Sequence, residues 1–220
     1  MSKLLLDTVF LILVALLPGL STLAYFIKTK KTNLVLLLLG GGGWLIALLA
    51  RTPILYALSN TIERTAYLVV ASYSAGLFEE SMRYLVLKTP LSKKSTEDAV
   101  ALGLSWGLTE ALFIYVLPIT IYTPVGYSLL ELLPGALERN IALLGHIVFS
   151  LIVLKALSKI IYLPASMLAH GSLNIVGVVT LDLTKNVWLT ETLLGLSVLL
   201  LFIATLHTLS RNPSNQVWST

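Results

Sequence analysis

Three ionisable residues lie close together in a stretch of the chain that is otherwise apolar. Glu79, Glu80 and Arg83 interrupt the run 65–87. On a helix Arg83 follows Glu79 by four residues and Glu80 by three, so either carboxylate can meet the guanidinium. Ionisable groups inside a bilayer cost several kcal/mol each, and they occur where they pair, face water or perform a function. This stretch is therefore the first candidate for chemistry.

Two histidines, an asparagine and a further glutamate fall in other apolar runs. They are His146, His170 with Asn174 one helical turn later, and Glu110. A lone histidine in a membrane is more often a hydrogen-bond partner between helices than a ligand, but two of them beside a glutamate pair favour a functional site. Glu110 lies among small residues, so it suits a site member and a packing contact equally well.

These residue types support two kinds of hydrolysis. A glutamate beside Arg83 can stay ionised and act as a general base toward water, while histidines and Asn174 stabilise an oxyanion. Alternatively, Glu79, His146 and His170 can hold a divalent metal such as zinc with one position open. Both routes cleave an amide bond within the membrane. No GxSxG or HExxH motif is present, which argues against serine and HExxH-type metallopeptidase mechanisms.

Composition places these residues in a membrane protein. The chain has 220 residues, of which 56% are hydrophobic and 12% charged, against about 25% charged in soluble domains. Its net charge of +4 comes from lysines in short loops, as in cytoplasmic loops of membrane proteins, and does not indicate nucleic-acid binding. With no cysteine, the chain has no disulfide, no thiolate nucleophile and no cysteine-based metal site.

A membrane-crossing helix needs about 20 apolar residues. Seven runs qualify, which predicts an all-α polytopic bundle in a single integral membrane domain, 1–220, with a catalytic-like core at about 65–181. The segment Pro53–Thr61 is expected to form a short interfacial or re-entrant helix, and Pro118–Pro134 a surface lid. The expected spans are Leu4–Ile27, Asn33–Ala50, Thr65–Leu87, Asp98–Leu117, Gly135–Leu157, Ile161–Leu181 and Leu189–Ser210.

Basic residues predict the orientation of this bundle. Nine follow alternate spans, against four at the opposite ends, which predicts an outside N-terminus and a cytoplasmic C-terminus. The nine are Lys28, Lys30, Lys31, Lys88, Lys93, Lys94, Lys155, Lys159 and Arg211. At 1.5 Å per residue, Glu79, His146 and His170 each lie about 14 Å from the cytoplasmic end of their spans, and Glu110 about 18 Å. The site is expected to open toward the cytoplasmic half.

The ordered motifs resemble those of the CPBP superfamily of intramembrane proteases (CAAX-protease and bacteriocin-processing, also called ABI), which carry EExxxR, FxxxH and HxxxN/D. The HxxxN element matches directly at His170–Asn174. Only two residues separate Glu80 from Arg83, and Ala142 stands in place of the phenylalanine. The EExxR spacing, followed by further matching positions, is more similar to the YhfC group, of which the PrsW-like group is a close relative. Those positions are Glu110, Glu138, Arg139 and His146.

The resemblance covers about 77–174 and implies an intramembrane protease. It implies a water-activating glutamate, with Glu79 the first choice and Glu80 supporting it, and Arg83 orienting the pair. The residues that would bind the oxyanion or position the water are then His146, His170 and Asn174. Members of the superfamily are described both as metalloproteases and as glutamate-dependent enzymes, so the resemblance leaves both mechanisms open.

We therefore expect a multi-pass protein of the plasma membrane that cleaves a membrane protein or peptide substrate. Two other functions fit the same residues. A scaffold or binding subunit, like the APH-1-type component of an intramembrane secretase, would use the buried polar groups for assembly. A proton- or ion-coupled transporter would use them as a relay, although no repeated halves are visible. Replacing Glu79 by glutamine should abolish cleavage with the fold nearly intact only if the chain is a peptidase.

Overall fold

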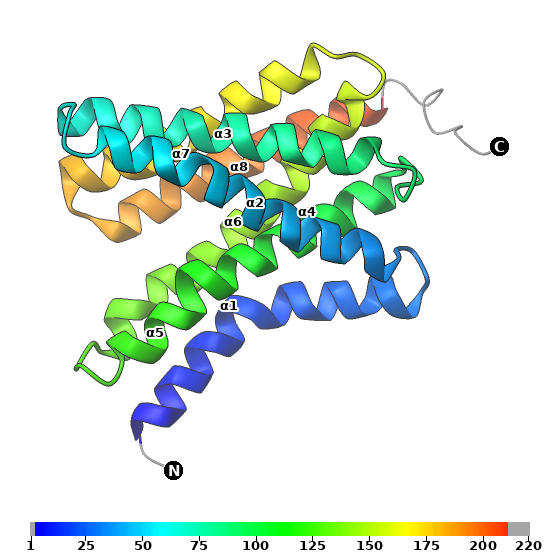
Figure 1. Cartoon of the computed structure of the whole chain (residues 1–220). Helices are drawn as coiled ribbons and strands as arrows, with labels where there is room; N and C mark the ends of the chain where they lie inside the picture. Colours follow the sequence, from blue (N-terminus) through cyan, green and yellow to red (C-terminus); the bar gives the residue numbers. More distant parts are fainter. Residues whose placement is uncertain (1–2, 211–220) are drawn as a thin grey trace.

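The computed structural model describes residues 3–210, and within that range the chain forms helices and no strand. The elements α4, η1 and α5 join into one continuous rod, so the bundle has seven long helices (Figure 1). In chain order they are α1 (Lys3–Lys28), α2 (Leu34–Leu58), α3 (Arg64–Lys88), α4 (Thr96–Glu110), the π-helix η1 (Ala111–Val116), α5 (Leu117–Tyr122), α6 (Leu129–Ala156), α7 (Tyr162–Thr184) and α8 (Val187–Ser210).

Six of these helices in the described range are long and apolar enough to cross a membrane: α1, α2, the rod Thr96–Tyr122, α6, α7 and α8. The seventh, α3, has 25 residues like α2, but it carries Glu79, Glu80 and Arg83 in its buried face. The predicted all-helical, multi-pass architecture is confirmed. That α3 also crosses the membrane, and that the N-terminus lies outside, stay predictions.

Both expected interruptions at prolines are wrong. Instead of a separate helix at Pro53–Thr61, α2 runs unbroken through Pro53 to Leu58. The segment Pro118–Pro134 forms no lid, because α5 continues the preceding rod through Pro118 and α6 already begins at Leu129. In a bilayer a broken helix leaves backbone groups without water, so proline is accommodated within the helix instead. The π-helical turns of η1, wider than α turns, come directly before Pro118.

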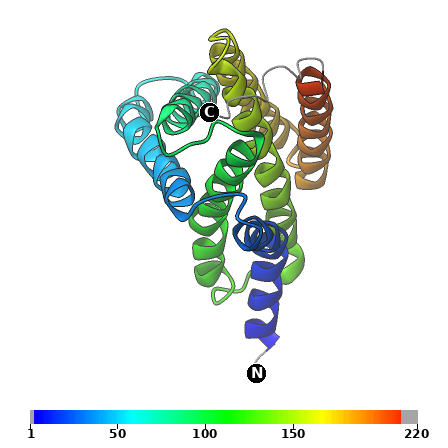
Figure 2. The same ribbon diagram turned by 90° about the vertical axis from the view of Figure 1, so that its right-hand side faces the viewer.

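Successive helices run in opposite directions, so their loops fall into two groups, one at each end of the bundle. The α1–α2, α3–α4 and α6–α7 loops, which hold most of the lysines, share one end, onto which Figure 2 looks. Contacts tie this end together, since Asn33 donates to the Leu91 carbonyl and Lys155 to the Thr208 carbonyl. At the opposite end Arg64 pairs with Asp182 at 2.7 Å. Arg211, counted above among the cytoplasmic residues, lies outside the described residues.

The start of α3 is set by Glu63 at this opposite end. Its carboxylate accepts hydrogen bonds from the backbone N–H groups of Thr65 and Ala66, which caps the helix. The bond from Thr65, more than that from Ala66, holds the pKa of Glu63 below its ordinary value. Arg64 pairs with Asp182, whereas Arg139 pairs with Glu110.

Glycines let the site-bearing helices approach closely. A Cβ at Gly76 of α3 would collide with the Met167 carbonyl of α7, and one at Gly103 of α4 would lie 2.6 Å from the Ile147 Cα of α6. These contacts bring α3 against α7 and α4 against α6 in the positions where they carry polar side chains. Gly40, Gly41 and Gly43 of α2 also lie close to side chains of neighbouring helices, and α2 is not broken at these glycines.

Candidate active site

Arg83 of α3 links the carboxylates of Glu79 and Glu80 to His146 of α6. Its Nη1 donates to Glu80 Oε1 at 2.7 Å, and its Nη2 lies 3.1 Å from His146 Nδ1 and 4.0 Å from Glu79 Oε2. The guanidinium also stacks on the Trp106 ring, 4.5 Å from its centroid. Because a guanidinium only donates, His146 Nδ1 must accept, which places the proton of a neutral ring on Nε2. The predicted pairing of Arg83 with a glutamate is therefore present, chiefly with Glu80.

Glu80 is fully buried and its oxygens have three partners. Besides Arg83, Ser166 donates to Oε2 at 2.9 Å and His170 Nδ1 lies 2.7 Å from Oε1. The ring of His170 stacks on Phe149, with the centroids 4.6 Å apart and the planes 7° apart. A carboxylate that accepts from Nδ1–H leaves Nε2 of His170 unprotonated in the neutral ring. Glu80 therefore positions His170.

Glu79 is buried but less firmly held. Trp106 Nε1 donates to its Oε2 at 3.0 Å, whereas Oε1 has only the Arg51 Nη2 atom at 3.9 Å. Arg51, in α2, makes no hydrogen bond to any residue in 3–210, and its Nε is buried without a partner. Among the four carboxylate oxygens of Glu79 and Glu80, Oε1 of Glu79 is thus the one that remains available to another group.

Glu110, the last residue of α4, completes the group. Its Oε2 lies 3.1 Å from His146 Nε2 and accepts from Trp44 Nε1 at 3.0 Å, while Arg139 Nη1 donates to Oε1 at 2.9 Å. Arg139 also pairs with Glu138. Glu110 is therefore a member of the site and not only a packing contact. The helix changes from α to π at the next residue, and single π turns often occur at functional sites.

A cavity of about 520 Å³ adjoins these side chains. Asn174 lines it but makes no hydrogen bond within the described range, so the predicted role of Asn174 stays a prediction. Every helix except α1 and α5 contributes to its wall. The polar residues that line it are Arg51, Ser72, Glu79, Glu110, Glu138, Arg139, His146, His170, Asn174, Thr190 and Glu191.

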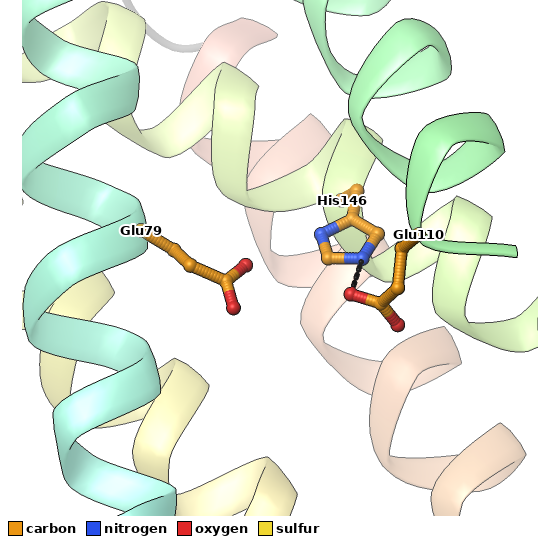
Figure 3. A group of neighbouring side chains, drawn as sticks. All are labelled: Glu79, Glu110 and His146. Atoms are coloured by element: carbon orange, nitrogen blue, oxygen red, sulfur yellow. Dashed lines mark hydrogen bonds and ion pairs between the residues drawn. The ribbon is translucent and has the colours of Figure 1, made fainter. Parts of the chain in front are cut away.

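Three of these residues form a group suited to a metal ion. One ligand atom each from Glu79, Glu110 and His146 lies within 4.8 Å of the other two (Figure 3). Two carboxylates and an imidazole are ordinary ligands of divalent metals. The four glutamates and two arginines that line the cavity leave a formal excess of negative charge, which favours a cation. The donor set therefore fits a divalent metal.

One feature of His146 departs from ordinary metal sites. A metal-binding histidine usually donates its second N–H to an acceptor, whereas Nδ1 of His146 faces the donor Arg83. A metal at Nε2 would take the place of the proton that Nε2 now shares with Glu110. The sequence suggested His170 as third ligand, but the group that the structure brings together has Glu110 in that position, and His170 Nδ1 lies against Glu80.

Comparison with known families identifies the chain. Residues 10–125, which include Glu79, Glu80, Arg83 and Glu110, match the YhfC intramembrane metalloprotease family. The protein belongs to this family. It is accordingly an integral, multi-pass membrane protein and a probable peptidase of the intramembrane metalloprotease type. No curated protein matches the chain.

Sequence reasoning missed several residues around this YhfC-family site. The sequence analysis gave no site role to Trp44, Trp106 or Arg51, and it named Arg139 only as a position that matches the YhfC group. In the structure both indoles donate to site carboxylates, and Arg139 holds Glu110. A buried tryptophan usually finds a partner for its N–H. Two tryptophans in apolar spans of a chain with glutamates in neighbouring spans were therefore the available indication.

Proposed function

We propose that the protein hydrolyses a peptide bond of a membrane-associated substrate at the group Glu79, Glu110 and His146, which would hold one divalent metal ion. The observation that carries this proposal is the convergence of these three side chains, two buried and that of Glu110 half-buried, beside a cavity, in a member of the YhfC metalloprotease family. A divalent metal bound there would polarise the substrate carbonyl and lower the pKa of water. Zinc suits these donors.

In the metal-free alternative, Glu79 is the residue that we assign to accept the proton of the attacking water. Its Oε2 is occupied by Trp106, but Oε1 has no hydrogen bond from any residue in the described range. Glu80 has no free oxygen of this kind, because its two oxygens already lie against Arg83, Ser166 and His170. Its side chain is also 0% exposed. The supporting role that the resemblance implied for Glu80 thus becomes a specific one, the orientation of His170.

Two further groups complete the proposed chemistry. His170 lines the cavity with Nδ1 committed to Glu80, so Nε2, which is unprotonated in the neutral ring, can take a proton from the attacking water and give it to the leaving amine. Arg51 also lines the cavity, beside Glu79 and with unused donors. A guanidinium in that position is suited to stabilise the negative charge that develops on the carbonyl oxygen.

The test combines metal content with cleavage in the purified, detergent-solubilised protein. We expect about one zinc per chain after exposure to Zn²⁺, and cleavage of a membrane-peptide library that a chelator stops. Glu79→Gln, Glu110→Gln and His146→Gln should each weaken zinc binding by at least the roughly 10–100-fold that loss of an outer-shell partner costs. Glu97→Gln and His207→Gln are the matched controls, because both side chains are exposed and distant from the site.

The outcomes separate the mechanisms. Cleavage by metal-free protein that stops in Glu79→Gln would contradict the metal and leave the glutamate as base. Absence of both zinc and cleavage in the parent would contradict the proposal and favour a scaffold, in which the buried polar groups serve assembly.

A further inference from the structure

The cavity lies on one side of the site only. Along α3 its wall includes Leu68, Ala71 and Ser72, all of which precede Glu79, and no later residue of that helix. Helix α7 runs antiparallel to α3. Its lining residues begin at His170 and continue toward the C-terminal end of the helix, as far as Leu181. On both helices the cavity therefore extends from the site toward the end that carries the α2–α3 and α7–α8 loops.

The opposite side of the site is filled. Between the carboxylates and the lysine-rich loops lies a core of fully or nearly fully buried side chains from α2, α3, α4 and α6. Val86 and Leu87 come directly before Lys88, the last residue of α3. Of the residues in this core, only Trp44 lines the cavity. The core residues are Leu36, Trp44, Ala47, Val86, Leu87, Leu102, Trp106 and Val153.

The far end of the cavity reaches the end of the bundle. Leu181, three residues before α7 ends, is 44% exposed, and Thr190 lies three residues after α8 begins. Figure 1 shows α3, α7 and α8 diverging at this end from α1, α5 and the start of α6. This direction is opposite to the lysine-rich half toward which the sequence predicted the site to open. The cavity extends away from the lysines.

We propose that water and the substrate reach the site through this cavity from the extracytoplasmic side of the membrane. The proposal rests on the proposed function and on the orientation that the lysines predict. Along α3 the cavity wall runs from Leu68 to Glu79, which is roughly 16 Å of helix. A volume of about 520 Å³ spread over that length is too narrow for an α-helix, which is about 10–12 Å across with its side chains. The substrate is thus a peptide segment that enters in an extended form, about five residues deep.

The absence of cysteine in the chain makes the route directly testable by single cysteines. Ser72→Cys places a thiol in the cavity wall, and Ser150→Cys places one at an equally buried serine of α6, one turn beyond His146 on the lysine side. Ser59→Cys and Ser158→Cys mark the exposed loops at the two ends. Intact cells are treated with a small, charged, membrane-impermeant methanethiosulfonate, and thiols left unmodified are counted after denaturation by a mass-tagged maleimide.

We expect the reagent to modify Ser59→Cys and Ser72→Cys in intact cells, and to modify Ser158→Cys only after permeabilisation. Ser150→Cys should stay unmodified in both. An unreactive Ser72→Cys beside a reactive Ser59→Cys, or a reactive Ser150→Cys, would overturn the route. Modification of Ser158→Cys but not Ser59→Cys in intact cells would overturn the extracytoplasmic assignment.

A cleavage measurement links the route to turnover. Modified Ser72→Cys should cleave at least tenfold more slowly than the same variant before modification, because the adduct occupies the cavity. Unchanged cleavage after complete modification would mean that substrate takes another path. Should the parent neither bind zinc nor cleave, the proposed function fails, while the labelling pattern still decides which side the cavity opens to.

Discussion

Arg83 is the residue on which the charges of the site depend. It is 0% exposed and it contacts Glu80, His146 and the ring of Trp106, with Glu79 at 4.0 Å. Removal of one partner from a buried ion pair leaves an uncompensated charge, which costs about 3–5 kcal/mol, whereas removal of both partners costs much less. The electrostatic cost should therefore appear mainly when Arg83 alone is changed.

The corresponding prediction is a double-mutant cycle. Arg83→Met should lower the free energy of unfolding by about 3–5 kcal/mol, and adding Glu80→Gln should recover part of that loss. Thermal unfolding in detergent measures both. Arg64→Met is the control, because Arg64 pairs with Asp182 at 2.7 Å but its side chain is 74% exposed, and such a pair contributes about 0–1 kcal/mol. Equal losses in Arg83→Met and Arg64→Met would contradict the role assigned to Arg83.

Depth along a helix was predictable from the sequence, but the direction of a side chain around the helix was not. Residue counts placed Glu79, His146 and His170 at one level, and the structure brings all three to one cavity. The counts did not reveal that His170 faces Glu80 while Glu110 faces His146. That choice depends on how the helices are rotated against one another, which the close approaches at glycines determine.

Among the helices, α3 and α7 form the contact that assembles the Glu80 side of the site. Gly76 lies one turn before Glu80, and it packs against the backbone of Met167 and Gly171, three residues before and one residue after His170. A methyl group there has no flexible side chain to displace, since its neighbours are backbone atoms. The two helices would have to separate, and the hydrogen bond of His170 with Glu80 would lengthen.

We predict that Gly76→Ala lowers the free energy of unfolding by about 1–3 kcal/mol, as overpacking does, and reduces cleavage as well. Gly42→Ala is the matched control, because a Cβ at Gly42 meets nothing within 4 Å and alanine favours a helix over glycine by about 1 kcal/mol. Thermal unfolding of the two variants in the same detergent measures the difference. A Gly76→Ala protein as stable as Gly42→Ala would show that α3 and α7 can separate without cost.

The sequence predicted the existence of the helices well and their ends at prolines poorly. In water a proline often ends a helix, and this experience suggested breaks at Pro53 and Pro118. Neither break occurs, because the chain keeps its backbone bonded within the segment. The long rod 96–122 that results carries Glu110 at the junction with η1, where the sequence had placed an uninterrupted span that ended near Leu117.

Over the whole molecule, charge and cavity are arranged at opposite ends. The lysine-rich loops lie at the end sealed by the apolar core, and the cavity extends toward the end that has few basic residues. A cytoplasmic lysine-rich end follows from the positive-inside rule, because lysines and arginines in short loops are retained on that side. The side from which a substrate reaches the site is thus fixed by residues that are distant from it.

The orientation itself is the last prediction. A fluorescent protein fused after Thr220 should fluoresce and alkaline phosphatase fused there should be inactive in a bacterial host, because α8 ends at the lysine-rich end. The same reporters fused after Gly126, in the α5–α6 loop, should give the reverse pattern. Replacing Lys28, Lys30 and Lys31 by glutamine should weaken the preference, since the first loops usually dominate orientation. Active phosphatase at Thr220 would place the lysines outside and would turn the cavity toward the cytoplasm.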